Sequence, residues 1–448
     1  MRCVRYLNRR PQGRRAFTTS SWMEKDVLEE LNRQRRLNKW IFRGMCIAAA
    51  TTGAVVCLRS TNCPLYNTIL SFVRTYIDPE VAHHLSITAL KLGLTPIDYS
   101  VDPPVIQSKV KDVVFFNPIG MAAGYDKQVE APLEILRLGF GFIEVGTVLP
   151  KPQEGNPKPV LFRLNNSKAI VNRCGFNSVG LEVALDRLKK VRKRQKNDSL
   201  TKDFLIGVSV GKNRDGEIIA DTVHVVKEVA PYSDYIAINV SSPNTPNLRD
   251  NQRREPLIAL VKAVKETMLK VKNELANSGQ HFTNTTKRAP LLFIKISPDV
   301  TRKELEDIAE IAITHNIDGI IATNTTISRP EEVAEDLAKA GKPNGGLSGK
   351  PLMKLSKQIV YDLYELTGGK VPIIADALEM IEAGASLCQL FTAMVYEGPS
   401  LPSTIKNNLA ELLMSKGYMN ITEAVGAQHS RRRESVNPPA TTITSTAR

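Results

Sequence analysis

Apolar runs alternate with amphipathic stretches along most of the chain from residue 113 onward. Each run is rich in Val, Ile and Phe and lacks the strict polar alternation of a half-exposed strand. Continuous apolar strands separated by helices are typical of parallel strands covered on both faces. The runs lie at residues 113–124, 140–148, 204–211, 234–242, 291–299, 318–326, 371–375 and 386–393.

Eight such strands predict an α/β fold, a (β/α)8 TIM barrel. An open doubly wound sheet is the alternative. It would more often show a GxGxxG motif after the first strand, and this sequence has none there. Helices are expected between the strands, at residues 131–138, 181–194, 256–275, 302–315, 352–366 and 378–383.

An uncharged stretch at residues 44–58 precedes the barrel, between Arg43 and Arg59. It is shorter than the ~20 residues that cross a bilayer. The flanking arginines can reach the headgroups, however, and Trp40 can lie at the interface. We therefore expect a single N-terminal membrane anchor at 44–58, after a polar helical linker at 23–43. The alternative is a short buried helix.

Two amphipathic segments follow, at residues 64–77 and 80–93, and Asp78-Pro79 separates them. They predict a small N-terminal helical domain over 64–99, ahead of a barrel at 100–428. Such a pair usually packs on its own domain. Directly after an anchor it can also lie on the bilayer and receive an apolar ligand from it.

The predicted strands end in groups that can hydrogen-bond a ligand. The ends read GYDK, GTV, GKN, NVSSPN, KISPD, TNTT and LFTA. Because a TIM barrel places its site at the carboxyl ends of its strands, we expect these groups to share one ligand site. They are rich in Asn, Thr, Ser, Lys and Gly and poor in His and Glu. This composition suits a flat polar ligand better than hydrolysis.

A glycine cluster at Gly345–Gly349, after the sixth strand, is a candidate phosphate cradle of backbone N–H groups.

The net charge of +14 is concentrated at the two ends of the 448-residue chain. Residues 1–43 carry +8 and residues 429–448 carry +3, which leaves +3 for the rest. This distribution argues against a nucleic-acid surface. The cysteines and histidines have no metal-ligand spacing, so we expect no metal.

The two ends of the chain also have distinctive compositions. Residues 1–22 contain six Arg and no acidic residue, which is typical of a mitochondrial transit peptide. A basic tail without that role is the alternative. Residues 429–448 are of low complexity and are predicted to be a disordered tail.

Six motifs, in order, resemble one enzyme family. NPIGMAAGYDK, PKPQEGNP, NRCGFNSVG, NVSSPNT, TNTTISRP and GGLSGKPL are similar to the class 2 dihydroorotate dehydrogenases, the membrane-linked mitochondrial or bacterial type. The resemblance covers residues 64–429. It implies FMN-dependent oxidation of dihydroorotate to orotate in pyrimidine synthesis. Ubiquinone would be the electron acceptor, and the mitochondrial inner membrane the location.

The resemblance also implies roles for individual residues. Ser242 would be the catalytic base, where the fumarate- or NAD-linked class has Cys. His83 and Arg163 would line the quinone tunnel. The implied substrate-binding residues are Lys127, Asn172, Asn239, Asn244, Asn324 and Thr325. The implied FMN-binding residues are Ala123, Gly124, Thr147, Asn239, Lys295, Thr323, Gly349, Phe391 and Thr392.

The sequence departs from the family pattern at several positions. Ser209 replaces an Asn, Cys174 an aromatic residue and Phe391 a Tyr. After the seventh strand the family carries a glycine-rich loop resembling GVGGVSSG, which donates N–H groups to the FMN phosphate. Here VPIIA runs directly into DALEMIEAGAS, about eight residues short of that pattern.

Several interpretations therefore stay open. The sequence describes an active enzyme in a mis-spliced or mis-annotated form, or a real variant with weak or no flavin binding. Another FMN barrel acting on pyrimidines, such as a dihydrouridine synthase, is a further alternative. It would need a basic RNA-binding face, which the +3 of the central region does not offer. A flavin-free membrane protein that binds partners is the alternative outside the enzymes.

Overall fold

The computed structural model describes residues 20–375 and 379–430. The chain divides into two compact units, residues 1–57 and residues 58–448, which are treated separately here.

The larger unit contains a closed barrel of parallel strands, which confirms the predicted fold. Around the ring the order is β10, β12, β13, β3, β4, β7, β8 and β9. In chain order the strands are β3 (Ile119–Met121), β4 (Phe142–Val148), β7 (Leu205–Val210), β8 (Tyr235–Asn239), β9 (Leu291–Ile296), β10 (Gly319–Ala322), β12 (Ile373–Ala375) and β13 (Leu387–Leu390). Their residues are almost all buried, as expected for strands covered on both faces.

The first predicted strand, 113–124, is in fact two strands. β2 (Val113–Phe115) pairs antiparallel with β1 (Ser108–Val110), and only β3 joins the barrel. Phe115 packs edge-on against Phe142 at the start of β4, with 5.2 Å between ring centroids. The hairpin therefore supplies apolar side chains to the cluster at the amino ends of the strands. A pattern of apolar residues could not separate the two strands, because both consist of apolar residues and glycine within one continuous run.

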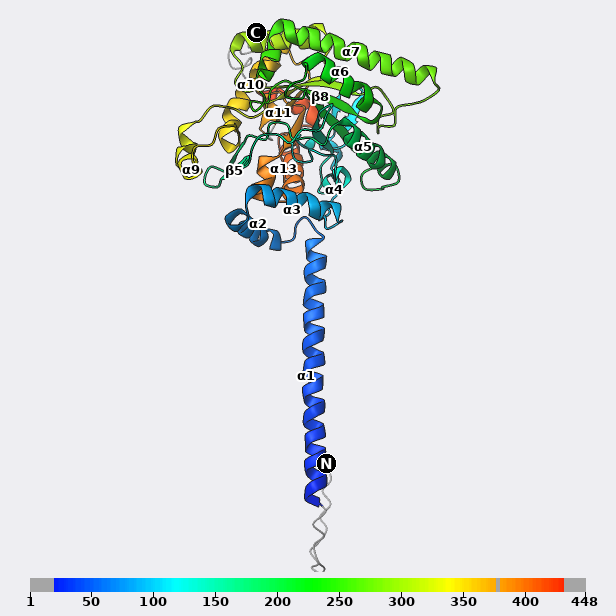
Figure 1. Cartoon of the computed structure of the whole chain (residues 1–448), viewed down its shortest axis with the longest axis vertical. Coiled ribbons are helices and arrows are strands. Elements are labelled where there is room, and N and C mark those ends of the chain that lie inside the picture. Colours follow the sequence, from blue (N-terminus) through cyan, green and yellow to red (C-terminus); the bar gives the residue numbers. More distant parts are fainter. Residues whose placement is uncertain (1–19, 376–378, 431–448) are drawn as a thin grey trace, which may run out of the picture. The chain divides into compact units, whose positions relative to one another are not determined.

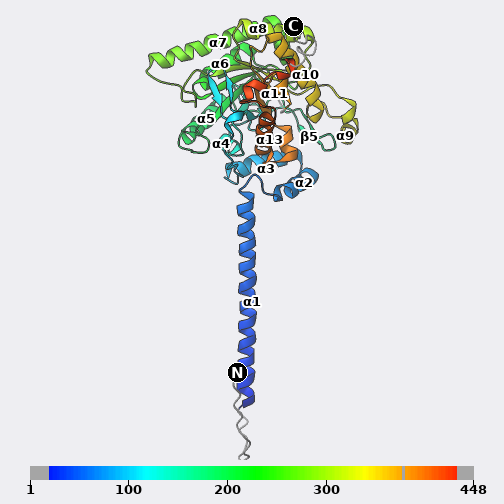
Figure 2. The ribbon, with the colours of Figure 1, turned by 180° about the vertical axis from the view of Figure 1, so that it is seen from behind.

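Helices surround the barrel, and Figures 1 and 2 show them from opposite sides. They are α4 (Pro132–Leu136), α5 (Leu181–Gln195), α6 (Ile218–Val229), α7 (Arg254–Asn277), α8 (Arg302–Thr314), α10 (Met353–Thr367), α11 (Met380–Ala383), α12 (Thr392–Glu397), α13 (Leu401–Ser415) and α14 (Ile421–Ala424). All six helices expected between the strands are present. The sequence analysis did not single out α6, whose Val225, Val226 and Val229 face the core.

A small antiparallel sheet is formed by two excursions from the barrel. β5 (Leu161–Leu164) and β6 (Ala169–Asn172) follow β4, and β11 (Gly346–Gly349) follows β10 and pairs with β6. The glycine cluster is thus a strand with paired backbone groups rather than the predicted open cradle. The pairing sets Asn172 opposite Gly346 and Ala169 opposite Gly349.

Two helices precede the barrel, as predicted. α2 (Leu65–Tyr76) packs against α12, and α3 (Pro79–Lys91) packs against α4 and β5. The Asp78 side chain accepts hydrogen bonds from the Glu80 and Val81 N–H groups and caps α3. Ten of the larger apolar side chains between residues 65 and 101 are more than 40% exposed.

The other unit contains α1 (Ser20–Leu58), a single helix. It replaces the expected division into a linker and an anchor. Residues 28–58 within it are long and apolar enough to cross a membrane, by length and composition. The predicted transit peptide lies almost wholly outside the described residues.

The predicted C-terminal tail begins too early. His429, its first residue, is 4% exposed and stacks on Tyr361 with 3.9 Å between ring centroids. The folded part therefore extends past residue 428, and residues 431–448 lie outside the described part.

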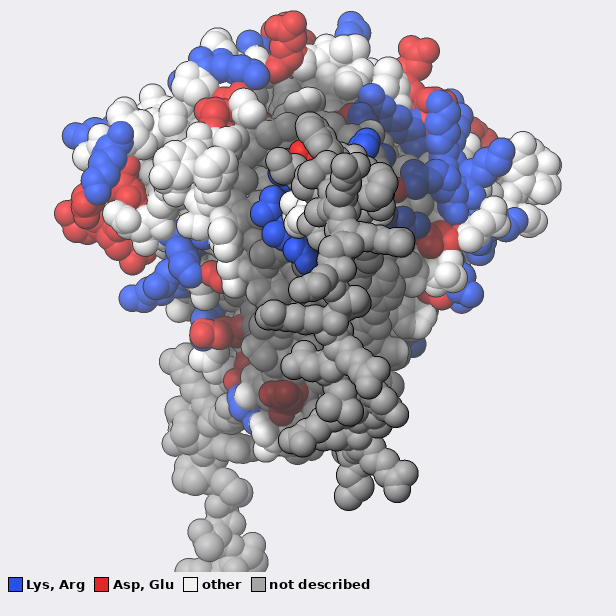
Figure 3. Space-filling model, turned by 90° about the horizontal axis from the view of Figure 1, so that it is seen from below, with Lys and Arg blue, Asp and Glu red and all other residues white. Residues whose placement is uncertain are grey.

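Lys and Arg side chains gather on one side of the surface drawn in Figure 3, the side on which Figure 1 places α5. Lys189, Lys190, Lys193 and Lys196, in or just after α5, are exposed. Elsewhere on this face the two signs of charge are mixed.

Candidate active site

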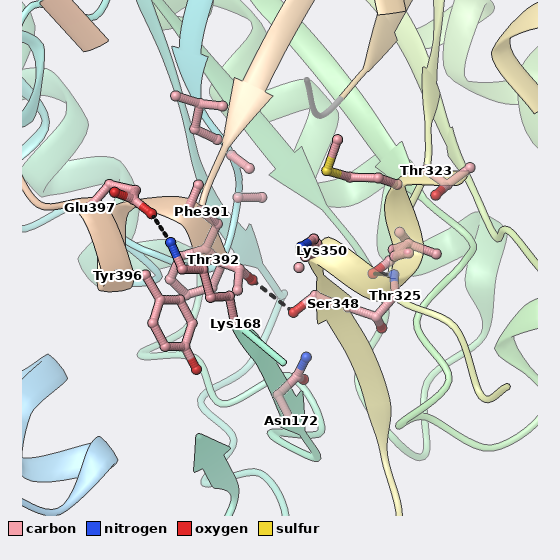
Figure 4. Close-up of a pocket in the computed structure, with 18 of the residues that line it drawn as sticks. Lys168, Asn172, Thr323, Thr325, Ser348, Lys350, Phe391, Thr392, Tyr396 and Glu397 are labelled. Carbon is pink, nitrogen blue, oxygen red and sulfur yellow. Dashed lines mark hydrogen bonds and ion pairs between the residues drawn. The ribbon is translucent and has the colours of Figure 1, made fainter. Parts of the chain in front are cut away.

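Two adjoining cavities lie at the carboxyl ends of the barrel strands. The larger has a volume of about 360 Å³ and extends to Ser348, Thr392 and Glu397 (Figure 4). The smaller, of about 120 Å³, contains Lys127, Ser242 and Asn244. Six residues line both cavities: Ala123, Asn172, Lys295, Asn324, Thr325 and Phe391. The cavities therefore form one continuous site.

Every residue assigned above to the base, the substrate or FMN lines one of these cavities. Nine of them line the larger cavity, namely Ala123, Asn172, Lys295, Thr323, Asn324, Thr325, Gly349, Phe391 and Thr392. The others line the smaller one: Gly124, Lys127, Thr147, Asn239, Ser242 and Asn244. These residues come from the ends of six barrel strands (β3, β4, β8, β9, β10 and β13) and from β6 and β11, so only barrel closure brings them together.

A network of amides and hydroxyls crosses the site. The Asn324 amide donates to Ser241 Oγ (2.9 Å) and to Asn239 Oδ1 (3.3 Å). The Asn239 amide donates to Thr147 Oγ1, and Thr147 shares a hydrogen bond with Ser209 (3.0 Å). These bonds hold groups from four strands in fixed positions, which favours the binding of a rigid polar ligand.

The smaller cavity contains the predicted base. Ser242 is 8% exposed, and its Oγ accepts a hydrogen bond from the Asn244 N–H at 3.3 Å. The Asn244 amide donates to Asn172 Oδ1 at 3.0 Å, which ties the loop after β8 to the end of β6. Lys127 Nζ donates to the Gly124 carbonyl at 2.5 Å and places a positive charge beside the cavity.

A buried charge pair, which the sequence analysis missed, lies under the site. Lys295 Nζ is 3.7 Å from Glu144 Oε1, and the Glu144 side chain is 0% exposed. Gln389 donates to Glu144 Oε2 at 2.9 Å and also contacts the Tyr235 hydroxyl. Burial, and then the charge of Glu144, raise the pKa of Tyr235 well above its usual value. The sequence did contain a signal for this charge pair. Glu144 lies inside the apolar run FIEVGTV, and a buried charge needs a partner.

The predicted quinone residues lie outside both cavities. The His83 ring, on α3, packs edge-on against Tyr125, and Tyr125 packs edge-on against Phe391. Burial, followed by the charges of Lys127 and His84, lowers the pKa of His83 to about 3, so the imidazole is neutral at physiological pH. Arg163 donates to the Val73 and Ile77 carbonyls at the end of α2. Both residues therefore connect the helical pair to the barrel.

The site is compatible with a flat, anionic cofactor such as FMN. Its volume is typical of cavities that bind small ligands. Lys295 is almost fully buried and has a carboxylate only at 3.7 Å. The Thr325 hydroxyl is buried with no hydrogen-bond partner in the described part of the chain. At Gly349, φ is +98° and a Cβ would come within 2.5 Å of the Lys168 carbonyl. The described residues contain no cluster of His, Cys, Asp or Glu that could hold a metal ion.

The family model described as dihydroorotate dehydrogenase matches residues 105–413. The chain belongs to this family. The recognition made from six sequence motifs is thereby confirmed, and so is the expectation of an oxidoreductase.

Curated relatives match a larger share of the chain than the family model does. The chain is 43% identical over 362 residues to a dihydroorotate dehydrogenase (quinone) of Rhodospirillum rubrum, covering 79% of this chain and 92% of the relative. It is 41% identical over 373 residues to the mitochondrial enzyme of that name from Mus musculus, covering 81% and 90%. A solved structure of a DHODH from Eimeria tenella in complex with ferulenol is similar with a TM-score of 0.76 and 40% identity, covering 81% of this chain and 99% of that one.

Proposed function

We propose that this chain oxidises dihydroorotate to orotate, with FMN as the bound cofactor and ubiquinone as the electron acceptor, in pyrimidine synthesis. One observation carries the proposal. All fifteen residues assigned to the base, substrate and cofactor line two adjoining cavities. Relatives of similar length carry the name dihydroorotate dehydrogenase (quinone).

The residues of the smaller cavity suit dihydroorotate. Lys127 offers a positive charge to its carboxylate, and the amides of Asn172, Asn244 and Asn324 can donate to and accept from the ring amides. Ser242 Oγ would receive the proton from C5 while its own hydroxyl proton passes on to solvent, and FMN, when bound, would supply the acceptor for the hydride from C6. The network behind these side chains holds them in place, so little ordering is needed when the substrate binds.

Lys295 and Glu144 suit the chemistry of a flavin. A lysine held under the larger cavity can stabilise negative charge at the edge of the cofactor ring. Glu144 supplies the opposite charge that lets Lys295 remain buried. Thr323, Gly349 and Thr392 would hold the rest of FMN.

The helical pair suits an apolar electron acceptor. Leu65, Phe72, Tyr76 and Leu85 expose large side chains on α2 and α3. His83 connects this pair to Phe391 at the cavity through Tyr125. Ubiquinone arriving from the bilayer would contact these side chains. With the apolar helix at 28–58 and the arginine-rich start, this favours a single-pass location in the mitochondrial inner membrane.

Flavin content and Ser242 together test the proposal. The purified chain should show a flavin absorption spectrum near one equivalent, and dihydroorotate should bleach it without oxygen. Ser242→Ala should keep the flavin and slow bleaching by about 10²–10⁴-fold, the usual contribution of a general base. Ser199→Ala, at an exposed serine, is the control. Undiminished bleaching in Ser242→Ala would refute the role of the base.

The short link between β12 and α11 favours a second candidate, a membrane protein that has lost flavin. A colourless protein that stays folded and binds no added FMN would support this candidate and exclude the first.

A further inference from the structure

One end of the larger cavity carries charged side chains to which the family resemblance assigned no role. Lys168, Lys350 and Glu397 line it together with Ser348 and Thr392 (Figure 4). Ser348 Oγ and Thr392 Oγ1 share a hydrogen bond of 2.8 Å, and either atom can donate. Two ammonium groups, one carboxylate and a pair of hydroxyls leave this end positively charged and rich in donors. This combination suits a phosphate group.

The backbone holds Lys168 beside this end. It lies in the turn between β5 and β6 with φ at +48°. Its carbonyl accepts a hydrogen bond from the Lys350 N–H at 3.3 Å, next to Gly349. A Cβ at Gly349 would collide with that carbonyl and approach Thr392 Cγ2 within 2.9 Å. Glycine therefore lets the β6–β11 pair bring Lys168 close to the hydroxyls of Ser348 and Thr392.

Glu397 is the partner of Lys168 in this structure. Lys168 Nζ lies 2.7 Å from Glu397 Oε1, and the two side chains are 57% and 48% exposed. An ion pair this exposed is easily broken. A polar cavity of about 430 Å³, lined by Asn67, Ser71, Arg74, Thr75, Asn165, Lys168, Tyr396 and Glu397, lies beyond the pair. The Glu397 carboxylate therefore has room to turn away from the cofactor cavity.

We propose that Lys168 binds a phosphate monoester at this end of the cavity, and that Glu397 holds the lysine in place until the anion replaces it. The inference rests on the proposed function, because the monoester is the phosphate of FMN. The family pattern places a glycine-rich loop after the seventh strand, and this chain has only residues 376–379 between β12 and α11. In this proposal Lys168 compensates for the backbone donors of the glycine-rich pattern that the sequence lacks.

The test compares FMN with riboflavin, which lacks the phosphate. The full-length chain in detergent, stripped of flavin, is titrated with each compound, and binding is followed by flavin fluorescence. The wild type should bind FMN more tightly. Lys168→Ala should weaken FMN binding by about 10–100-fold, the range of one lost charge-assisted bond, and leave riboflavin binding unchanged. Lys168→Arg should keep the preference for FMN, and Glu397→Gln should strengthen FMN binding.

Lys158→Ala is a matched control. Lys158 is also an exposed lysine with a carboxylate partner, 3.2 Å from Glu80, but it does not line the cavity. Circular dichroism of each variant checks folding. If Lys168→Ala bound FMN as tightly as the wild type, this inference would be wrong and the proposed function would stand. If the wild type bound neither FMN nor riboflavin, the cofactor assignment, and the inference with it, would be refuted.

Discussion

At the scale of single residues, the site combines groups whose charge depends on burial. Lys295 and Glu144 are both buried, and each supplies the opposite charge that the other needs. His83 differs, since it is held neutral by burial and by nearby positive charge. The two environments differ in charge. Lys295 and Glu144 support the site electrostatically, whereas the neutral ring of His83 packs beside it.

Glu144→Gln should strongly destabilise the protein. It leaves Lys295 buried without a carboxylate, and breaking a buried pair typically costs about 3–5 kcal/mol. Urea denaturation measures this free energy. The double variant Glu144→Gln, Lys295→Met should be more stable than Glu144→Gln alone, because no unpaired charge remains. Glu335→Gln breaks the exposed pair with Lys339 and should change stability far less. If Glu144→Gln and Glu335→Gln lowered the free energy of unfolding equally, the buried pair would not have the importance that we expect.

His83 should make stability depend on pH. The unfolded chain gains a proton on His83 as the pH falls through its ordinary pKa of 6.5, while the folded protein keeps the ring neutral until about pH 3. The free energy of unfolding therefore falls as the pH decreases between these values. His83→Phe keeps a ring beside Tyr125 and removes this proton, so its stability should fall less between pH 7 and pH 5. Denaturation at several pH values measures the difference.

His281→Phe, at an exposed imidazole, is the control for that series. If the free energy of unfolding depended on pH identically in wild type and His83→Phe, the His83 ring would contribute nothing to the pH dependence of stability.

At the scale of elements, strand ends carry most of the site, and small additions complete it. The β5–β6–β11 sheet supplies Asn172, Gly349 and, from its turn, Lys168. Arg163, in β5, donates to two carbonyls at the end of α2. The last carbonyls of a helix have no partner within it, so such a side chain stabilises the helix end. Under the proposed function, this contact keeps the quinone-facing helix on the barrel.

Arg163→Met should loosen the end of α2. Hydrogen exchange of the amides around Ile77 should speed up at least about tenfold, because two charge-assisted hydrogen bonds are lost. Quinone reduction should fall, while reduction of the flavin by dihydroorotate stays unchanged, since Arg163 lines neither cavity. Arg173→Met, which removes a donor to the Pro159 carbonyl, is the control. If Arg163→Met slowed quinone reduction and flavin reduction equally, Arg163 would belong to the substrate site instead.

At the scale of the whole molecule, the chain joins a catalytic barrel to an apolar helix. The barrel unit has its own large core and holds both cavities. The helix at residues 28–58 contains a stretch that is long and apolar enough to cross a membrane, and none of that stretch is buried. An exposed apolar helix of this length is stable in a bilayer and unfavourable in water.

Two arginines in the apolar segment should prevent membrane integration. Ala49→Arg with Ala54→Arg adds about 2.5–3.5 kcal/mol per charge to the insertion free energy. Carbonate extraction of membranes should then release the protein, with its flavin content unchanged. Asn32→Arg with Asn38→Arg, in the polar part of the same helix, adds the same charge and should leave the protein in the membrane. Retention of the Ala49→Arg, Ala54→Arg variant would argue against an anchor.

The sequence by itself determined the eight strands, their parallel order and the polar groups at their ends. Buried strands and amphipathic helices are local patterns, and each is visible in a few consecutive residues. The six motifs then identified the family, because they also lie within short stretches. The residues that the resemblance assigned to substrate or cofactor line the two cavities, and each of them lies in or near such a short stretch.

Only the tertiary structure decided which distant residues meet. Three contacts depend on closure of the barrel and on the two excursions that form the β5–β6–β11 sheet. They are the ion pairs Lys295–Glu144 and Lys168–Glu397 and the hydrogen bonds from Arg163 to the end of α2. The β1–β2 hairpin was hidden because β2 and β3 lie in one continuous apolar run. Such contacts join positions up to hundreds of residues apart, and no local pattern specifies them. The Lys295–Glu144 pair forms because an unpaired buried charge has a higher free energy than a paired one.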